Sequence, residues 1–281
     1  MKVHYSLYSL TPLKVHNRLS TMKPQEGVLL RGVLGNKTTF CDYFPHTTLG
    51  DKNVEEFLET FKFQEKNYEK KCFDFLLRDH ELYWTKPKAI KNHKLWSVGE
   101  DLAPTIKYKV KGHDDYGFLT ALKNKIPTRL DANGLFSRTE FLKFMKGIPE
   151  DLIPSIEYIE DPLYESDWKD LPLKTAKDFI EATPYDYVVY KPNAEFKPVT
   201  DLPIIFSTYL GHNLGRWHAY CELLREGNLD LVHGIQTSGF YQEEVNLFDG
   251  NYHQGLSANL RSVQKMYKDI SHLNWKNLCS M

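Results

Sequence analysis

Carboxylate side chains stand at the ends of three short apolar segments in the second half of this chain. They are Asp131, Glu160 and Asp178. If the segments are strands of one parallel barrel, the carboxylates would converge, because the C-terminal ends of the strands form a single face. Three carboxylates with open positions for water and substrate suit a hard cation, either Mg²⁺ or Mn²⁺. Buried carboxylates would otherwise repel one another, so the sequence predicts a metal site here.

Lysines stand before and after these carboxylates. Lys107, Lys109 and Lys111 alternate along one segment, which places all three on the same face of a strand. An edge strand whose lysines block aggregation would show the same alternation. The order of the residues favours a site, because Lys191 ends a later segment and the carboxylates would then have lysines on both sides.

The first part of the chain predicts antiparallel strands followed by helices. Gly35 and Asn36 separate the strand-like segments Val28–Leu34 and Thr38–Tyr43, which is a hairpin signal. Asp51 is the predicted N-cap of the next helix. That helix carries apolar residues at helical spacing, namely Val54, Phe57, Leu58 and Phe61.

Short β-rich segments recur from His93 onward, and helical patterns such as Ser137–Met145 separate several of them. This alternation predicts an α/β fold with a parallel sheet, and eight such segments suit a closed barrel. Only Gly99 to Pro104 separates the first two, so the barrel must be trimmed. The segments are Leu95–Val98, Thr105–Lys111, Thr128–Asp131, Ser155–Glu160, Leu171–Asp178, Tyr187–Lys191, Ile204–Tyr209 and Leu229–Ile235.

Two domains are therefore expected. A capping domain would comprise residues 1–92 together with the tail 238–281, and the barrel would comprise residues 93–237. The tail carries a helical pattern and is expected to return to the first domain. The polar residues 12–27 could close over a substrate, and Arg18 could meet a carboxylate there.

Composition excludes several classes of protein. The chain has 281 residues, 41% hydrophobic and 26% charged, which is typical of a globular protein. A formal net charge of −1 makes nucleic acid an unexpected partner. Four scattered cysteines suggest neither a zinc site nor a disulfide framework. No apolar run approaches a membrane span and the N-terminus has no signal-peptide core, so the expected location is the cytoplasm.

Four motifs together resemble the KxK, DxN, E-[EQD]-P and KP signatures of the enolase superfamily, muconate-lactonising subgroup. That subgroup pairs an α+β capping domain with a modified (β/α)₇β TIM-type barrel, and the resemblance implies the same fold and a Mg²⁺ cofactor here. The motifs are Lys107-Tyr-Lys109, Asp131-Ala-Asn133, Glu160-Asp161-Pro162 and Lys191-Pro192.

Within this subgroup the chain is similar to the o-succinylbenzoate synthase family. Arg129 resembles an arginine that some of those enzymes use, and the segment from Ser207 to Gly215 resembles their serine-rich turn. The segment His233-Gly234-Ile235-Gln236-Thr237 resembles their turn after strand eight. The resemblance implies substrate-binding roles for Lys107, Arg129, Ser207 and Gly234.

The chain departs from the family pattern in its capping domain, where Cys41-Asp42-Tyr43-Phe44-Pro45 replaces the usual glycine-glutamate-proline sequence, and in two of the barrel motifs. Lys111 leaves the lysine motif open between Lys107/Lys109 and Lys109/Lys111, although Lys109 belongs to both. A Lys177-Asp178-Phe179 sequence replaces the usual DES-like motif, so Asp178 is the weakest of the implied ligands.

The resemblance implies a carbon–oxygen lyase of menaquinone biosynthesis. It would dehydrate a small carboxylate, 2-succinyl-6-hydroxy-2,4-cyclohexadiene-1-carboxylate, to 2-succinylbenzoate by syn elimination. Lys109 would remove the proton next to the carboxylate and protonate the departing hydroxide. Lys107 beside it would lower the pKa of Lys109. Lys191 would act as a cation that holds the intermediate.

Two other functions remain open from the sequence. An N-acylamino-acid racemase or dipeptide epimerase could use two opposed lysines to exchange protons on both faces of a substrate. A non-catalytic barrel scaffold could also retain the fold, although Lys109 and Lys191 would then have no evident purpose.

Overall fold

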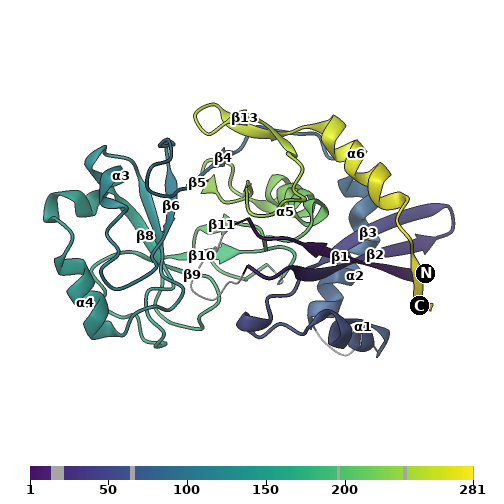
Figure 1. Cartoon of the computed structure of the whole chain (residues 1–281), viewed down its shortest axis with the longest axis horizontal. Coiled ribbons are helices and arrows are strands. Elements are labelled where there is room, and N and C mark those ends of the chain that lie inside the picture. The colour runs from purple at the N-terminus through teal and green to yellow at the C-terminus, as the bar shows by residue number, and fades with distance from the viewer. Residues whose placement is uncertain (14–21, 64–66, 195–196, 237–238, 281) are drawn as a thin grey trace.

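The computed structural model describes residues 1–13, 22–63, 67–194, 197–236 and 239–280. Figure 1 shows two parts side by side. One is a curled parallel sheet with short helices around it, and the other is an antiparallel sheet with longer helices against it. The suggested contact through Arg18 lies outside the described residues, as do residues 237 and 238 at the expected domain boundary.

The antiparallel sheet has the order β15-β1-β2-β3. Its strands are β1 (Lys2–Leu10), β2 (Gln25–Leu34), β3 (Lys37–Tyr43) and β15 (Lys276–Ser280). The predicted hairpin at Gly35-Asn36 is confirmed, since Leu34 pairs directly with Lys37 across the turn. Gly35 adopts a φ of 61°, which glycine reaches at little cost.

Two helices follow this sheet in the sequence, α1 (Val54–Phe63) and α2 (Asn67–Leu82), with a short 3₁₀ turn, η1 (Thr47–Leu49), before them. The prediction that Asp51 caps α1 was wrong. The Asn53 side chain accepts the Glu56 backbone N–H at 3.0 Å, and the Glu56 carboxylate accepts the Asn53 N–H in return. Asp51 instead accepts the Tyr209 hydroxyl at 2.7 Å.

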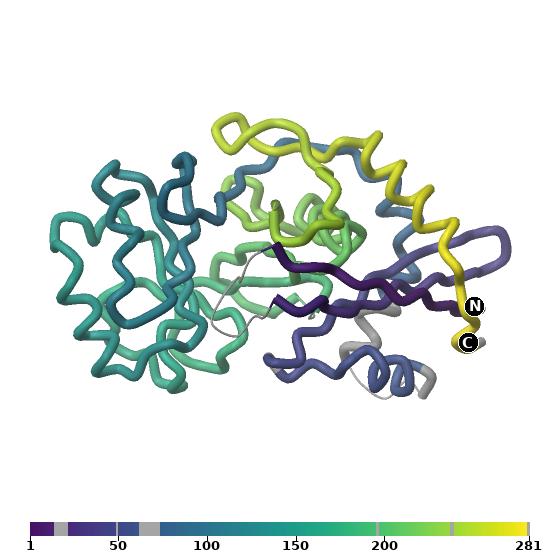
Figure 2. Tube along the Cα trace, in the orientation of Figure 1, coloured from purple at the N-terminus to yellow at the C-terminus, as the bar shows by residue number. Residues whose placement is uncertain are grey.

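The C-terminal tail forms the hairpin β13 (Phe248–Asn251) and β14 (Gly255–Ala258), the helix α6 (Leu260–Ser271) and β15. Strand β15 pairs antiparallel with β1, so the tail ends on the first sheet. The two termini consequently lie side by side, as the tube in Figure 2 shows.

The parallel sheet has seven strands in the order β11-β10-β9-β8-β7-β6-β5. Beyond its edges, β12 pairs in parallel with β4, and β4 leads through His93 directly into β5. A parallel bridge joins Ser207, after β11, to Gly234, after β12. These links bring the two edges together, which gives the predicted TIM-type barrel. The strands are β4 (Lys91–Asn92), β5 (Lys94–Leu95), β6 (Ile106–Lys109), β7 (Thr128–Asp131), β8 (Ile156–Glu160), β9 (Thr175–Lys177), β10 (Tyr187–Tyr190), β11 (Ile204–Phe206) and β12 (Val232–His233).

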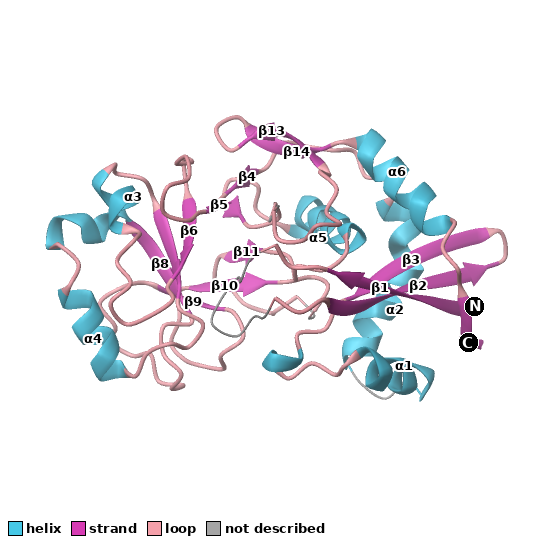
Figure 3. Ribbon diagram, viewed as in Figure 1, coloured by secondary structure: helices cyan, strands magenta, loops and turns pink. Residues whose placement is uncertain are grey.

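The outer helices of this barrel are few. Helix α3 (Leu119–Lys123) follows β6, while α4 (Arg138–Lys146) and the 3₁₀ turn η2 (Glu150–Ser155) follow β7. Helix α5 (Asn213–Glu226) follows β11. Residues 161–174 and 178–186 are all described and contain no helix, so the barrel is trimmed as predicted (Figure 3). Ser137 caps α4 through a capping box with Glu140.

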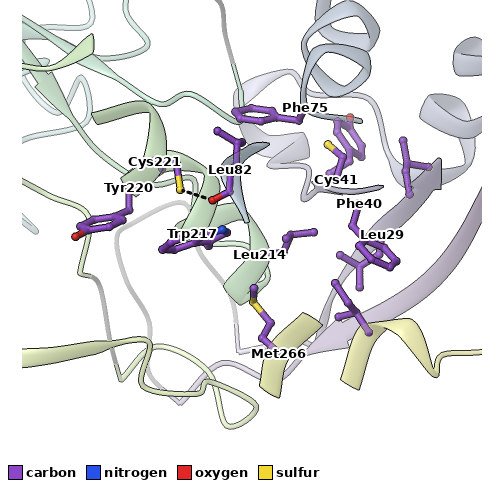
Figure 4. Close-up of a cluster of buried hydrophobic side chains, with 14 of the residues drawn as sticks. Leu29, Phe40, Cys41, Phe75, Leu82, Leu214, Trp217, Tyr220, Cys221 and Met266 are labelled. Carbon is purple, nitrogen blue, oxygen red and sulfur yellow. Dashed lines mark hydrogen bonds between the residues drawn. The ribbon is translucent and has the colours of Figure 1, made fainter. Parts of the chain in front are cut away.

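Helix α5 joins the two parts through a shared apolar core. Its residues from Asn213 to Leu223 are all buried, which a helix packed on several sides requires. Figure 4 shows Leu214, Trp217 and Tyr220 of α5 among side chains from β2, β3, α2 and α6. The barrel strands are therefore positioned firmly against the antiparallel sheet.

Candidate active site

The lysine-bearing strand places its side chains by simple alternation. In β6, Ile106 and Tyr108 pack into the apolar core, while Lys107 and Lys109 point the other way, into a cavity at the end of the barrel. Lys111 lies beyond the strand and is exposed, and its backbone N–H donates to Asp115. The geometry thus pairs Lys107 with Lys109 in the cavity and leaves Lys111 outside it.

The strand register places charged residues at the ends of three neighbouring strands opposite one another. Lys109 of β6 lies opposite Asp131 of β7, and Asp131 lies opposite Glu160 of β8. Asp178 and Lys191 follow β9 and β10 directly. All of these side chains line one cavity. We call the six residues the carboxylate–lysine cluster: Lys107, Lys109, Asp131, Glu160, Asp178 and Lys191.

Ion pairs connect the cluster. The Lys107 ammonium lies 2.7 Å from both Glu160 carboxylate oxygens and 2.9 Å from Asp131 Oδ2. The Lys109 ammonium lies 2.7 Å from the same Asp131 oxygen. Lys191, after β10, contacts Asp178 at 2.5 Å. The two lysines with predicted catalytic roles therefore belong to separate ion pairs.

Burial and charge act in opposite directions on these groups. Burial raises the pKa of Glu160, the nearby Lys107 lowers it, and the Asp131 and Asp178 charges raise it, which leaves it at about 7. Burial would also raise the pKa of Asp131, but Lys107 and Lys109 hold it well below its usual value. Burial would lower the pKa of Lys107, yet Asp131 and Glu160 keep it well above 10.5. Glu160 is thus compensated less completely by its neighbours than Asp131 is.

Three carboxylates of the cavity provide the oxygen ligands that a hard divalent cation prefers. Asp131, Glu160 and Asp178 supply only carboxylate oxygens to one cavity, as Mg²⁺ prefers. In the described part of the chain, no three His, Cys, Asp or Glu side chains already stand in the arrangement of a metal site. The lysine ammonium groups lie between the carboxylates and provide the positive charge instead.

The four predicted substrate-binding residues differ in their placement. Lys107 and Ser207 line the cavity directly. Gly234 bridges to Ser207, and a side chain at Gly234 would lie only 2.8 Å from the His93 ring. Arg129 is buried below the cavity, where its guanidinium donates to Glu157 and to the Val232 carbonyl.

Other residues line the cavity that the sequence did not single out. His93 stands at the break between β4 and β5, and His46 enters from the segment after β3. The His46 ring contacts the Tyr209 carbonyl at 3.0 Å, and Lys191 lies over the Tyr209 ring at 5.4 Å. No short motif marks these positions, because their partners come from distant parts of the chain.

Comparisons with known proteins give similar sequences and folds. The chain matches no family model. It is 28% identical over 296 aligned positions to an o-succinylbenzoate synthase of Bdellovibrio bacteriovorus, covering 86% of this chain and 88% of that protein.

Several solved structures share the fold. The crystal structure of o-succinylbenzoate synthase from Thermosynechococcus elongatus BP-1, with Mg in its active site, has a TM-score of 0.67 at 13% identity, covering 96% of this chain and 100% of that one. An enolase family member from Agrobacterium tumefaciens with homology to dipeptide epimerases has a TM-score of 0.65 at 14% identity, covering 93% and 98%. The predicted fold, a TIM-type barrel with a capping domain, is confirmed.

The helices that the structure describes do not have the length and polarity of a membrane span. Among the described residues, every helix is too short or too polar to cross a bilayer.

Proposed function

We propose that this chain, an enolase-superfamily protein by fold and a relative of o-succinylbenzoate synthase by sequence, catalyses the o-succinylbenzoate synthase reaction. It would dehydrate 2-succinyl-6-hydroxy-2,4-cyclohexadiene-1-carboxylate to 2-succinylbenzoate, as a hydro-lyase of menaquinone biosynthesis acting in the cytoplasm. The observation that carries the proposal is the carboxylate–lysine cluster, in which charged residues from successive parallel strands line one cavity.

Lys109 is the proposed base. It lines the cavity from β6, and its Nζ is held 2.7 Å from Asp131. In its deprotonated form, the amine would have a fixed position from which to take the proton next to the substrate carboxylate. In a syn elimination the leaving hydroxyl departs from the same face. Protonated Lys109 can then return its proton to that oxygen, which leaves as water.

Lys191 is the proposed electrostatic partner on the other side. Its pKa is raised because the Asp178 and Glu160 charges outweigh the effect of burial, so the group stays cationic at neutral pH. A fixed cation there stabilises negative charge that develops on the substrate after proton removal. A base and a separate permanent cation suit a syn elimination, in which the proton and the hydroxyl leave from the same face of the substrate.

Asp131, Glu160 and Asp178 are the proposed ligands of a Mg²⁺ ion. When bound, the ion would stabilise the negative charge of a substrate carboxylate. Nothing observed here favours Mn²⁺. Lys107 lies between Asp131 and Glu160, and its charge favours the ionised form of both carboxylates. Ser207 would contact the substrate carboxylate, and Gly234, which is bridged to Ser207, would lie beside it.

An epimerase reaction is the second candidate. The observation in its favour is that Lys109 and Lys191 approach the cavity from different strands, β6 and β10, as proton exchange on two faces would need. Fold similarity does not separate the two functions, because both kinds of enzyme share it. The sequence relationship to a synthase favours dehydration.

An ultraviolet assay for the aromatic product tests the proposal. Purified chain with Mg²⁺ and the cyclohexadiene substrate should form 2-succinylbenzoate, and the Lys109→Ala and Lys191→Ala variants should not. Dipeptides incubated with the chain in D₂O provide the parallel test for epimerisation. Deuterium exchange at an amino-acid α-carbon, without dehydration of the cyclohexadiene, would replace the synthase proposal with the epimerase one.

A further inference from the structure

His93 occupies an unusual position at the junction of the two barrel edges. It separates β4 from β5, is 4% exposed, and lines the cavity of the carboxylate–lysine cluster. Its backbone N–H donates to the His233 carbonyl at 2.9 Å, and its carbonyl accepts the Asn92 side chain at 2.6 Å. The backbone of His93 is therefore held on both sides.

The ring of His93 is held by Arg129. The guanidinium Nη1 lies 3.1 Å from His93 Nδ1. A guanidinium has only donors, so Nδ1 must be the acceptor in this contact. A neutral imidazole that accepts at Nδ1 carries its proton at Nε2. Arg129 thus selects the tautomer in which Nε2–H is the donor.

Arg129 is itself held by several contacts, so its guanidinium stays in place to favour the Nε2–H tautomer of His93. Its Nε donates to Glu157 at 2.6 Å, and Nη1 donates to the Val232 carbonyl at 2.8 Å. The guanidinium also lies over the Tyr158 ring at 5.0 Å. Burial, together with the Arg129 and Lys107 charges, lowers the pKa of His93 well below its usual value. The ring consequently remains neutral.

The Nε2 edge of the ring packs closely against Gly234. A Cβ at Gly234 would lie 2.8 Å from both Cε1 and Nε2 of His93, and 3.2 Å from Ser207 Oγ, so a side chain there would displace the ring. His93 and Ser207 both line the cavity, which is the open space beside them. No residue that the structure describes hydrogen-bonds to Nε2.

We infer that His93 is a fixed, neutral hydrogen-bond donor that binds a carboxylate oxygen of the substrate through Nε2–H, beside Ser207. This inference rests on the proposed function, since it assigns the donor to the substrate of the same site. Arg129 is then a positioning residue that acts through His93. The lysines of the cavity are already paired with carboxylates. A further cation would be attracted to the same carboxylates, whereas a neutral donor remains available to bind an anionic substrate.

Two substitutions separate a donor from a space-filling ring. The amide nitrogen of glutamine reaches approximately where Nε2 of histidine lies, so His93→Gln keeps a donor. His93→Leu keeps a comparable volume but removes it. Loss of one hydrogen bond to a charged group should weaken binding of 2-succinylbenzoate, and lower kcat/KM, by about 10- to 100-fold in His93→Leu. His93→Gln should recover most of both.

Nitrogen NMR on ¹⁵N-histidine-labelled chain tests the tautomer independently of activity. The His93 signals, assigned by their loss in His93→Gln, should show a directly bonded proton on Nε2 and none on Nδ1. Addition of 2-succinylbenzoate, measured in parallel by calorimetry, should shift the Nε2–H signal. An Nδ1–H tautomer would overturn the inference, as would equal product affinity in the wild type and both variants, or equal losses in both variants.

The same measurements separate this inference from the proposed function. If the wild type binds 2-succinylbenzoate with the expected dependence on His93 but dehydrates no substrate, the donor stands and the synthase proposal fails. If the wild type does not bind 2-succinylbenzoate at all, both are overturned.

Discussion

Two buried clusters of charged residues in this molecule differ in how completely their carboxylates are satisfied. In the first, Asp79 of α2 accepts hydrogen bonds from the Phe40 backbone N–H, the Tyr267 hydroxyl and the His218 ring. These partners come from β3, α6 and α5, and the cluster lies within the apolar core that joins the two parts. The second is the carboxylate–lysine cluster of the barrel.

The second cluster contains a carboxylate, that of Glu160, which its neighbours compensate less completely. Its carboxylates line a cavity, and the pKa of Glu160 is raised to about 7 because burial and two neighbouring carboxylates outweigh Lys107. Asp79 contributes to stability by fixing β3, which is the edge strand of its sheet. The difference indicates that a satisfied buried carboxylate serves the fold, whereas an incompletely compensated one beside a cavity is a candidate for function.

Replacement of Lys109 should give the largest effect. Lys109→Ala removes both the base and the acid of the proposed elimination, so kcat should fall by more than the ~10⁴-fold upper range for one general base. Unfolding by urea should change little, because Lys107 still faces Asp131 at 2.9 Å. Lys111→Ala is the matched control and should remain fully active, since Lys111 is exposed outside the cavity. Activity in the first variant and none in the second would reverse the assignment.

Removal of divalent metal should abolish turnover, and Mg²⁺ should restore it. Binding to the native state alone stabilises it by about 2.7 kcal/mol at a ligand concentration 100-fold above Kd. The melting temperature of the wild type should therefore rise with Mg²⁺, while that of Glu160→Gln should not. A Mg²⁺-dependent shift of equal size in both proteins would place the metal away from Glu160. The Asp79 cluster should be insensitive to Mg²⁺ in either protein.

A third buried carboxylate, Asp42 of β3, has a hydrogen-bond donor in Tyr8 and yet has a raised pKa. Burial raises its pKa to about 7, although the Tyr8 hydroxyl, the His212 backbone and the Arg216 charge all favour its ionised form. Its folded-state pKa thus exceeds the unfolded value of 3.8. The protonated carboxyl contributes stability that is fully present below that unfolded value and is lost as the pH rises through about 7.

Urea unfolding at pH 5 and pH 8 measures this contribution. The wild type should lose more free energy of unfolding between these pH values than Asp42→Asn does, by about 2 kcal/mol for a shift of this size. Saturating Mg²⁺ at both pH values keeps the Glu160 titration out of the comparison. An identical pH dependence in the two proteins would show that Asp42 ionises normally despite its burial.

The sequence was sufficient to predict the barrel and the order of its charged strand ends. Period-two alternation placed Lys107 and Lys109 on one face, and β6 shows that arrangement. Each strand and its charged end can be predicted from residues within a few positions of one another. The Asp51 prediction failed because Asn53, two residues later, forms a reciprocal pair with Glu56 that a single-residue preference does not reveal.

Contacts between distant segments could not be predicted in this way. Arg129 meets His93, which is 36 residues away, and Val232, which is 103 residues away. No local pattern encodes such a meeting, because it depends on closure of the barrel through β4 and β12. His93 consequently carried no sequence signal, although it lines the same cavity as Lys107 and Lys109.

The smallest effect on catalysis is expected in the Asp79 cluster, where a substitution should change stability alone. Tyr267→Phe removes one donor from a buried carboxylate that retains its bonds to Phe40 and His218. A buried acceptor that loses one partner costs about 1–3 kcal/mol, so the urea midpoint should fall while kcat and KM stay at their wild-type values.

Tyr116→Phe is the control for that substitution. The Tyr116 hydroxyl donates to a neutral acceptor, the Phe144 carbonyl, at 3.1 Å near the surface, so its loss should cost about 0.5–1.5 kcal/mol. A larger loss in Tyr267→Phe than in Tyr116→Phe, with unchanged kinetics in both, is the expected result. If Tyr267→Phe instead lowered kcat without lowering stability, the Asp79 cluster would be coupled to the cavity. The distinction between a carboxylate that serves the fold and one that serves the reaction would then not hold for this protein.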